Sequence, residues 1–446
     1  MATPLYPPGP VGHPILGMLA GLRQGRLEFY TQLARDYGDL VRFRFLHRRI
    51  YLASHPDLIE QVLVTDARHY IKHFGARMYK PVLGNGLVTS EGDFWLRQRK
   101  LAQPAFLKSR VLAYAPVMAE LTEQMTTGWI EGQQVDIHQQ FSHLTSAIAL
   151  KTLFGLDDPG DRETFVVALR EAFTKLTGRL FSWNGLLPLW FPTPANRRIQ
   201  RAIQHLNEVV DGYIARGKSR TEPGDDLLSR LIAARDEQGQ PMTERQLRDE
   251  AMTLYLAGHE TTALTLSWAW YLLAQHPGVE ERLVAEWSEV LRGRTPTAED
   301  LPRLPYTDAV ILEAMRIYPP VYLIGREATC DLELGGYRVP RGTTIFMSQW
   351  VSHRDPRYFG PDAEVFRPER WLDGLLQRIP KYAYYPFGGG PRVCIGNTFA
   401  LIEAAILLAG VGQKYRFTLD PEPPVGLNPQ ITLLPRDGIP ATLQRR

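Results

Sequence analysis

One stretch constrains the fold more than any other: a helix-forming pattern that runs from about Thr243 to Gln275. It stops at His276-Pro277-Gly278, a common helix-ending signal. Small or apolar residues recur along it in alternating steps of four and three, as on a buried helix face: Leu247, Ala251, Leu254, Gly258, Thr261, Thr265 and Trp268. At 1.5 Å per residue, such a helix is about 50 Å long. The chain is therefore expected to fold around one long central helix.

The middle of this helix carries an unusual polar segment, "AGHETT", at residues 257–262. Gly258 costs about 1 kcal/mol in a helix interior, and threonine hydroxyls can bond back to carbonyl groups and bend the helix. We expect the helix to open locally here for a functional reason. A harmless polar patch on a core helix is the alternative, and this segment alone leaves both open.

The rest of the chain predicts a mainly α protein with small β-sheets, in the α+β class. Helical periodicity dominates from about residue 94 to 318. Strand-like runs lie near both ends, at 40–45, 48–53, 337–347 and 431–435. These β pieces have to meet in space, so we expect a single domain over residues 1–446, with an N-terminal β-rich part at about 35–70.

Composition excludes several classes of protein. The net charge is +3 for 446 residues, too small to indicate a nucleic acid partner. Two cysteines, Cys330 and Cys394, cannot build a disulfide framework, and no CxxC spacing indicates zinc. The first residues lack a signal-peptide pattern, and no uninterrupted apolar run of about 18 residues occurs. We expect a cytoplasmic, monomeric protein without a transmembrane anchor.

Cys394 lies in "FGGGPRVCIGNTFA" (387–400), a glycine-rich loop followed by strong helix formers. A cysteine at a helix N-terminus favours the thiolate. It could be a structural cysteine, but a nucleophile would need a histidine base, and none of the histidines considered lies in a recognisable Cys-His context: His259, His276 and His353. A lone thiolate suits a metal whose other ligands come from a cofactor, most obviously haem.

Here the sequence resembles a known family. Phe387-x-x-Gly390-x-Arg392-x-Cys394-x-Gly396 matches, at every defined position, the haem-ligating signature of the cytochrome P450 superfamily. The resemblance implies that Cys394 is the proximal ligand of the iron in haem b (iron protoporphyrin IX). It also implies that Arg392 pairs with a haem propionate and that Phe387 packs near the sulfur. The glycines would give clearance for a flat macrocycle.

Two further segments are similar to the family and imply a structural ion network. "EAMR" supplies Glu313 and Arg316 on a helix that ends before Pro319-Pro320, and "FRPERW" supplies Arg370. By itself an i,i+3 pair of this kind is usually a surface ion pair of small worth. The resemblance implies instead that the three residues form a buried network that supports the cysteine loop.

Other residues are expected to bind the haem propionates. Trp95 and Arg99 lie one helical turn apart in "FWLRQRK", similar to the family's helix whose tryptophan and arginine reach the propionates. The alternative without a role in binding is a core tryptophan with a solvated arginine. Arg326, ten residues after Arg316, is a further candidate.

The "AGHETT" segment is similar to the family's oxygen-activation segment, with Glu260 and Thr261 as the catalytic acid–alcohol pair. The resemblance implies a monooxygenase that inserts one atom of O₂ into a C–H or C=C bond. A peroxide-driven peroxygenase is one alternative, but such members typically replace the acid–alcohol pair. A haem-based sensor without turnover is the other.

Substrate and electron donors follow from the same resemblance. The expected access segments, 73–92 and 180–194, are rich in apolar residues and indicate a lipophilic substrate. No flavin or iron–sulfur motif is present, so electrons should come from ferredoxin and ferredoxin reductase, or from flavodoxin. Arg97 and Lys100 are candidate contacts to an acidic donor.

Overall fold

The computed structural model describes residues 5–156, 158–180, 188–221, 224–420 and 424–446. The chain forms two compact units. Unit 1 comprises Met1–His73, Met118–Leu144 and Thr261–Arg446, and unit 2 comprises Phe74–Val117 and Thr145–Glu260. Helices dominate and the strands form small sheets, as expected from the sequence. The single domain over the whole chain stays a prediction.

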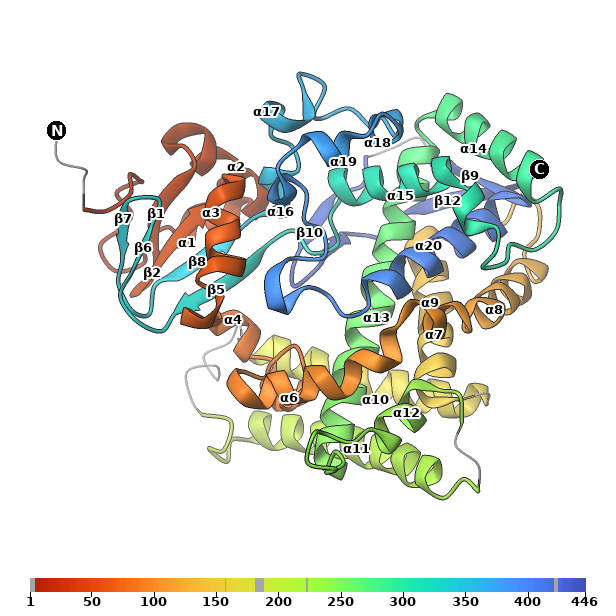
Figure 1. Cartoon of the computed structure of the whole chain (residues 1–446), viewed down its shortest axis with the longest axis horizontal. Helices are drawn as coiled ribbons and strands as arrows, with labels where there is room; N and C mark the ends of the chain where they lie inside the picture. The colour runs from red at the N-terminus through yellow and green to blue at the C-terminus, as the bar shows by residue number, and fades with distance from the viewer. Residues whose placement is uncertain (1–4, 157, 181–187, 222–223, 421–423) are drawn as a thin grey trace. The chain divides into compact units, whose positions relative to one another are not determined.

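Unit 1 holds a mixed sheet with strand order β1-β2-β8-β5-β3, built from both ends of the chain (Figure 1). Its strands are β1 (Leu40–Phe45), β2 (Arg48–Ala53), β3 (Tyr70–Lys72), β5 (Ile324–Ala328) and β8 (Thr344–Met347). β1 and β2 form a hairpin in which Leu40 pairs with Ala53, and β2 runs parallel to β8 with Ile50 opposite Thr344. The N-terminal and C-terminal β pieces therefore meet as predicted.

The remaining strands form smaller sheets in unit 1. They are β4 (Gln134–Asp136), β12 (Pro440–Arg445) and β9 (Tyr415–Leu419) in one sheet, β6 (Leu332–Leu334) with β7 (Tyr337–Val339), and β10 (Leu427–Pro429) with β11 (Leu433–Pro435). The predicted run 337–347 is thus two strands, β7 and β8. Pro340 cannot donate to a ladder, and Gly342 has a φ of +80°, so a turn separates them.

Most of the helices lie between the early and late strands. The longer ones are α2 (Arg26–Tyr37), α6 (Gly92–Ala102), α8 (Ala115–Thr127), α9 (Ile137–Phe154), α10 (Pro159–Leu180), α11 (Pro194–Lys218), α13 (Glu244–Leu273), α14 (Pro277–Val290), α15 (Pro305–Ile317) and α20 (Asn397–Gly412). The shorter ones are α1 (Leu19–Gln24), α3 (Pro56–Glu60), α4 (Phe74–Arg77), α5 (Lys80–Leu83), α7 (Lys108–Leu112), α12 (Leu227–Ala233), α16 (Gln349–Ser352), α17 (Pro356–Phe359), α18 (Glu369–Leu372) and α19 (Leu375–Arg378).

Helix α13 is the long central helix that the sequence predicts. Its bounds, Glu244–Leu273, lie within two residues of the expected ones. The expected opening at 257–262 is not a break, because α13 is a continuous helix through these residues. One glycine costs about 1 kcal/mol, which the packing of so long a buried helix outweighs. The carbonyl of His259 also accepts a hydrogen bond from the Thr145 hydroxyl at 3.0 Å.

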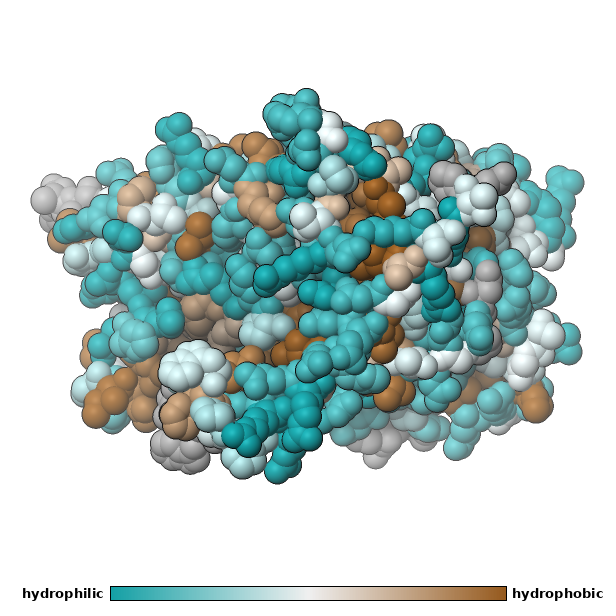
Figure 2. Space-filling view, turned by 90° about the horizontal axis from the view of Figure 1, so that it is seen from below, coloured by the Kyte–Doolittle hydropathy of each residue, from teal (hydrophilic) through white to brown (hydrophobic). Residues whose placement is uncertain are grey.

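In unit 2, helix α11 buries one apolar face and leaves its other side to solvent. Its buried residues recur every three or four positions, as in an amphipathic helix: Asn196, Ile199, Ala202, Leu206, Val210, Tyr213 and Ile214. Tyr213 packs on Phe165 of α10, with ring centroids 6.3 Å apart. The face in Figure 2 is mostly hydrophilic, with apolar residues in small scattered patches. Within the described ranges, no helix is long and apolar enough to cross a membrane.

Candidate active site

The segment Phe387–Gly396 forms a closed loop just ahead of helix α20. Gly388 and Gly390 adopt φ values of +70° and +64°, which favour glycine. The backbone N–H of Cys394 donates to the carbonyl of Phe387 at 3.0 Å and closes the loop. The backbone therefore holds Cys394 in place, and this hydrogen bond does not involve the cysteine side chain.

Two glycines of this loop allow other parts of the protein to pack closely against the loop backbone. A Cβ at Gly390 would overlap the carbonyl oxygen of Leu63, and a Cβ at Gly389 would overlap the ring of Tyr382. The sequence suggested that the glycines give clearance for a bound macrocycle. For Gly389 and Gly390 that interpretation needs correction, because their missing side chains make room for the protein's own residues.

Cys394 is exposed and lies three residues before helix α20. The positive end of a 16-residue helix favours a thiolate there. Apolar side chains flank the cysteine yet are only half-buried, at Val393, Ile395, Phe399 and Leu401. By contrast, most of α20 after Leu401 is fully buried. An exposed sulfur beside half-covered apolar side chains is a surface suited to an apolar group.

Glu313, Arg316 and Arg370 come together in a fully buried ion network in unit 1. Arg316 donates two hydrogen bonds to the Glu313 carboxylate, both 2.8 Å, and Arg370 donates one at 2.9 Å. The indole N–H of Trp371 and the backbone N–H of Arg367 complete the carboxylate's partners at 2.8 and 2.9 Å. The three side chains are at most 3% exposed, so this is not the surface pair that the bare spacing suggests.

A chain of hydrogen bonds runs from this network to the cysteine loop. Arg316 donates to the carbonyl of His353 at 2.9 Å. The ring Nε2 of His353 accepts from the backbone N–H of Tyr385 at 3.0 Å, and the Tyr385 carbonyl accepts from Gly388 at 2.9 Å. The buried charges therefore fix the position of the loop that carries Cys394. Sequence reasoning missed His353 and Trp371 in these roles, although Trp371 directly follows Arg370.

The residues expected to bind propionates are placed in both units. In unit 1, Arg326 lies on strand β5 and is 9% exposed, and Arg392 is half-buried at the end of the glycine loop. Arg326 donates to the carbonyl of Gly325 at 3.0 Å. In unit 2, Trp95 is buried and Arg99 half-buried, one turn apart on α6. Their role as propionate ligands stays a prediction.

Glu260 and Thr261 lie in a partly accessible stretch of α13, just before its fully buried C-terminal part. Ala257 is exposed and the following residues to Thr261 are half-buried, whereas residues 262–273 of α13 are buried. The Thr261 carbonyl accepts the hydroxyl of Thr265 at 3.0 Å. Both side chains can therefore be reached at the point where the continuously buried part of α13 begins, which is compatible with a role for the acid–alcohol pair.

Arg97 and Lys100, the expected contacts to an electron donor, already have acidic partners within unit 2. Arg97 pairs with Asp236 at 2.7 Å, and Lys100 pairs with Glu237 at 2.7 Å. Sequence reasoning could not foresee these pairs, because the partners lie about 140 positions further along the chain. An acidic donor would have to compete with Asp236 and Glu237 for both cations.

Glu403 is a buried acid that sequence reasoning missed. It lies on α20, nine residues after Cys394, and is 1% exposed. Burial raises the pKa of Glu403 to about 8, although a hydrogen bond with Thr262 lowers it. Among the described residues its second oxygen has no hydrogen-bond partner. The signal was present in the sequence, as a single acid in the apolar run "ALIEAAILLA".

Glu403 makes a pH-dependent contribution to stability that can be measured. Its folded-state pKa lies above the usual value of 4.5, so its contribution is fully present below about pH 4.5 and is lost as pH rises through 8. Relative to Glu403→Gln, the free energy of unfolding of the natural protein should fall by roughly 1 kcal/mol per pH unit between pH 5 and 8. Urea unfolding across this range checks it, and parallel curves for the two proteins would contradict it.

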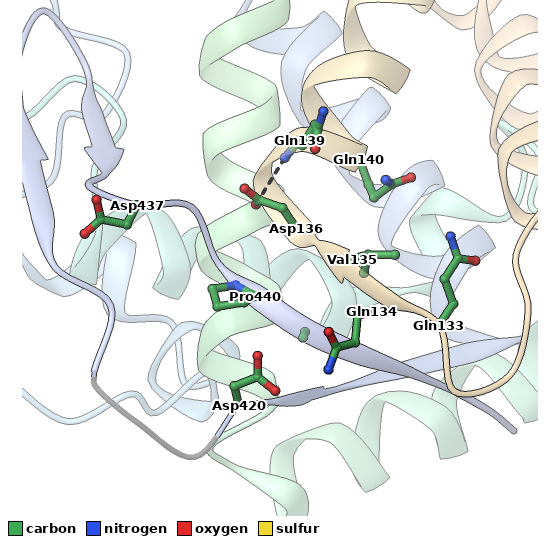
Figure 3. A pocket seen from close by; sticks show the side chains of 10 residues that line it. Gln133, Gln134, Val135, Asp136, Gln139, Gln140, Asp420, Asp437 and Pro440 are labelled. Carbon is green, nitrogen blue, oxygen red and sulfur yellow. Dashed lines mark hydrogen bonds between the residues drawn. The ribbon is translucent and has the colours of Figure 1, made fainter.

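Unit 1 also has a polar hollow, and none of the predicted site residues line it. Gln133, Gln134, Asp136, Gln139 and Asp437 are among the residues that line it (Figure 3). The Asp136 carboxylate caps the start of α9, accepting from the backbone of His138 at 2.9 Å and of Gln139 at 3.3 Å. Within the described residues, no group of three or more histidines, cysteines or acids is placed to hold a metal ion. Asp136, one of the lining residues, therefore has a structural role as the cap of α9.

Comparison with known proteins agrees with this geometry. A family model described as Cytochrome P450 matches residues 7–439. Cyclooctatin synthase of Streptomyces melanosporofaciens is 39% identical, with 95% of this chain and 92% of the relative covered. Cyclooctat-9-en-7-ol 5-monooxygenase of the same organism is 38% identical, covering 92% and 88%. A retinoic acid bound cyanobacterial CYP120A1 structure is 28% identical, with a TM-score of 0.86 over 99% of each chain.

The residues present fit the haem of that family. Cys394 offers an exposed sulfur donor, its neighbours Val393 and Ile395 are half-buried apolar residues, and Arg392, two residues away, could pair with a carboxylate. A thiolate with no second protein ligand nearby in sequence suits an iron held mainly by a macrocycle. The sequence resemblance and the predicted fold are therefore confirmed: the chain belongs to the cytochrome P450 family and is a monooxygenase.

Proposed function

We propose that this enzyme hydroxylates or epoxidises an unsaturated, ring-containing, lipophilic substrate with O₂. Haem b would be its cofactor, and ferredoxin with ferredoxin reductase, or flavodoxin, would supply electrons. The observation that carries the proposal is the exposed Cys394 thiol on a loop fixed by the buried Glu313 network. A sensor could share the haem, but it would not need the accessible Glu260–Thr261 pair.

Each predicted site residue has a defined role in this proposal. When bound, the haem would supply an iron centre that binds and activates O₂, with Cys394 as its protein ligand. Arg392, Arg326, Trp95 and Arg99 would bind the propionates and orient the ring. Phe387 would pack beside the sulfur and limit its contact with water.

Glu260 and Thr261 would supply protons. One oxygen atom enters the substrate, and the other leaves as water after it takes up two protons and two electrons. The Thr261 hydroxyl would hold a proton donor at the oxygen, and the Glu260 carboxyl would pass protons in from solvent. Their partial exposure in the middle of α13 supports such a path.

The substrate class is argued from the relatives and from the access segments. The relatives' names indicate cyclic, unsaturated skeletons and their alcohols. In this chain, Val82, Leu83 and Leu87 of segment 73–92 are buried, and Tyr79 stacks on Phe173 at 5.9 Å. Residues 181–187 of the other expected segment, 180–194, lie outside the described residues. An apolar access segment favours an apolar substrate.

Isotopically labelled O₂ tests the proposal. With cyclooctat-9-en-7-ol as probe and a ferredoxin system, the natural enzyme should place label in the product. Thr261→Ala should lower product formation by roughly one to two orders of magnitude and release hydrogen peroxide, because the proton donor is lost. Thr261→Ser keeps the hydroxyl and should restore coupling. Unlabelled product, or unchanged coupling in Thr261→Ala, would contradict the proposed roles.

A further inference from the structure

The loop at residues 84–90 of unit 2 lies with its backbone directly against α13. A Cβ at Gly84, whose φ is +61°, would overlap the carboxylate of Asp249. A Cβ at Gly86 would overlap the hydroxyl of Thr253 and would come within 2.5 Å of the carbonyl of Asp249. Only glycine allows this approach, so the chain is built to seat this loop on the helix.

Two consecutive acids of α13 bind the seated loop. Asp249 accepts the backbone N–H of Asn85 at 2.8 Å. Glu250 accepts the backbone N–H of Leu87 at 3.0 Å through one oxygen and the side-chain amide of Gln98 at 3.2 Å through the other. The Glu250 and Gln98 side chains are fully buried. Glu250 therefore joins the loop, helix α6 and helix α13 at one point.

The connection to α6 matters because Gln98 lies beside the predicted propionate ligands. Trp95 is three residues before Gln98, and Arg99 is the next residue. The loop itself is internally bonded, since the Thr89 hydroxyl donates to the Gly84 carbonyl at 2.7 Å and Ser90 N–H to the Gly86 carbonyl at 2.9 Å. It can therefore move as a unit when its attachment to Glu250 changes.

The charges around the cluster leave Glu250 without compensation. On α13 and α5, three cations act on Asp249, namely Arg245, Arg248 and Lys80, although burial still raises the pKa of Asp249. Among the described residues, the one charge that shifts the pKa of Glu250 is that of Asp249, which has the same sign and raises it. Loop 84–90 carries no charged residue, and Gln98 on α6 is neutral. The Arg97 guanidinium donates to the Gln98 amide oxygen at 3.2 Å and pairs with Asp236, so it reaches Glu250 only through Gln98. Burial raises the pKa of Glu250 to about 7.

We propose that Glu250 is a positioning residue and a pH-dependent latch: in its neutral form it keeps loop 84–90 closed on α13 and α6, and its ionisation releases the loop. A neutral carboxyl still accepts the Leu87 N–H through its carbonyl oxygen and tolerates burial. An ionised carboxylate without a cation gains hydration when the loop lifts. Loop 84–90 lies in the expected access segment, so release would ease substrate entry, a consequence that rests on the proposed function.

The direction of the pH effect on loop closure follows from the coupling between proton binding by Glu250 and closure. The pKa of Glu250 is about 7 when the loop is closed and near its ordinary 4.5 when water reaches it. Closure is therefore fully stabilised below about pH 4.5 and weakens as pH rises, with no further change above about pH 7. Between these values the equilibrium constant for opening rises about tenfold per pH unit.

Hydrogen exchange of the haem-loaded enzyme tests the latch without substrate or turnover. After correction for intrinsic exchange, the protection of the Leu87 amide should fall about tenfold between pH 5.5 and 7 and then level off. Glu250→Gln, and Glu250→Met if the first variant folds poorly, should give a pH-independent protection factor. Glu244→Gln removes an exposed acid from the same helix and should keep the natural profile.

Two results would overturn the latch. One is a pH-independent protection factor of Leu87 in the natural enzyme. The other is a falling profile that survives in Glu250→Gln, because another group would then control the loop. Either result leaves the labelled-O₂ experiment unaffected, so failure of the latch and failure of the proposed function can be told apart.

Discussion

Replacing Cys394 with alanine should abolish monooxygenation and leave the protein folded. The side chain is exposed, so it adds little to the core. The hydrogen bond that closes its loop comes from the backbone N–H, which alanine retains. What alanine lacks is the thiolate, which we propose as the protein ligand of the iron. Product formation with the labelled-O₂ assay should fall to background, while circular dichroism and urea unfolding stay close to those of the natural protein.

The second cysteine provides the matched control. Cys330 is partly buried, with its Sγ 3.7 Å from Nδ1 of His69. Cys330→Ala should retain both the haem and the activity. Full activity in Cys394→Ala, or equal loss in both variants, would show that Cys394 is not the ligand.

Glu313→Ala should prevent accumulation of haem-loaded protein. The change leaves two arginines buried without their carboxylate, together with the indole N–H of Trp371. Removing one partner of a buried ion pair costs roughly 3–5 kcal/mol, a large share of a total stability of about 5–15 kcal/mol. The hydrogen-bond chain through His353 to the loop would lose its anchor as well.

Holo-protein yield and urea unfolding measure this effect. Glu237→Ala is the control, because it breaks an exposed ion pair with Lys100 that is worth less than about 1 kcal/mol. Glu313→Gln keeps the shape but not the charge and should lie between the two. Natural yield and stability in Glu313→Ala would show that the network is dispensable.

The sequence predicted the parts of the fold that depend on local pattern. The alternating apolar steps placed α13 within two residues of its bounds, because a buried face must repeat with the helix period. The strand-like runs at 40–45 and 48–53 are β1 and β2; exposed and buried residues partly alternate in β1, whereas the last four residues of β2 are all buried. The predicted haem-ligand loop, 387–396, ends directly before helix α20 begins at Asn397.

What the sequence could not predict depends on contacts between distant residues. Gly390 was assigned to clearance for a macrocycle, but its partner is the Leu63 carbonyl, more than 300 positions away. Arg97 was assigned to a donor surface, yet Asp236 binds it. No pattern in the sequence marks Glu250, because its burial against Gln98 is set by tertiary packing alone.

Ligation of the haem iron by the Cys394 thiolate is tested most directly by the absorption spectrum of the reduced enzyme under carbon monoxide. We predict the strongly red-shifted Soret band of thiolate-ligated haem in the natural protein and in Cys330→Ala, and its loss in Cys394→Ala. A band typical of histidine-ligated haem in the natural protein, or a red-shifted band that persists in Cys394→Ala, would contradict this ligation.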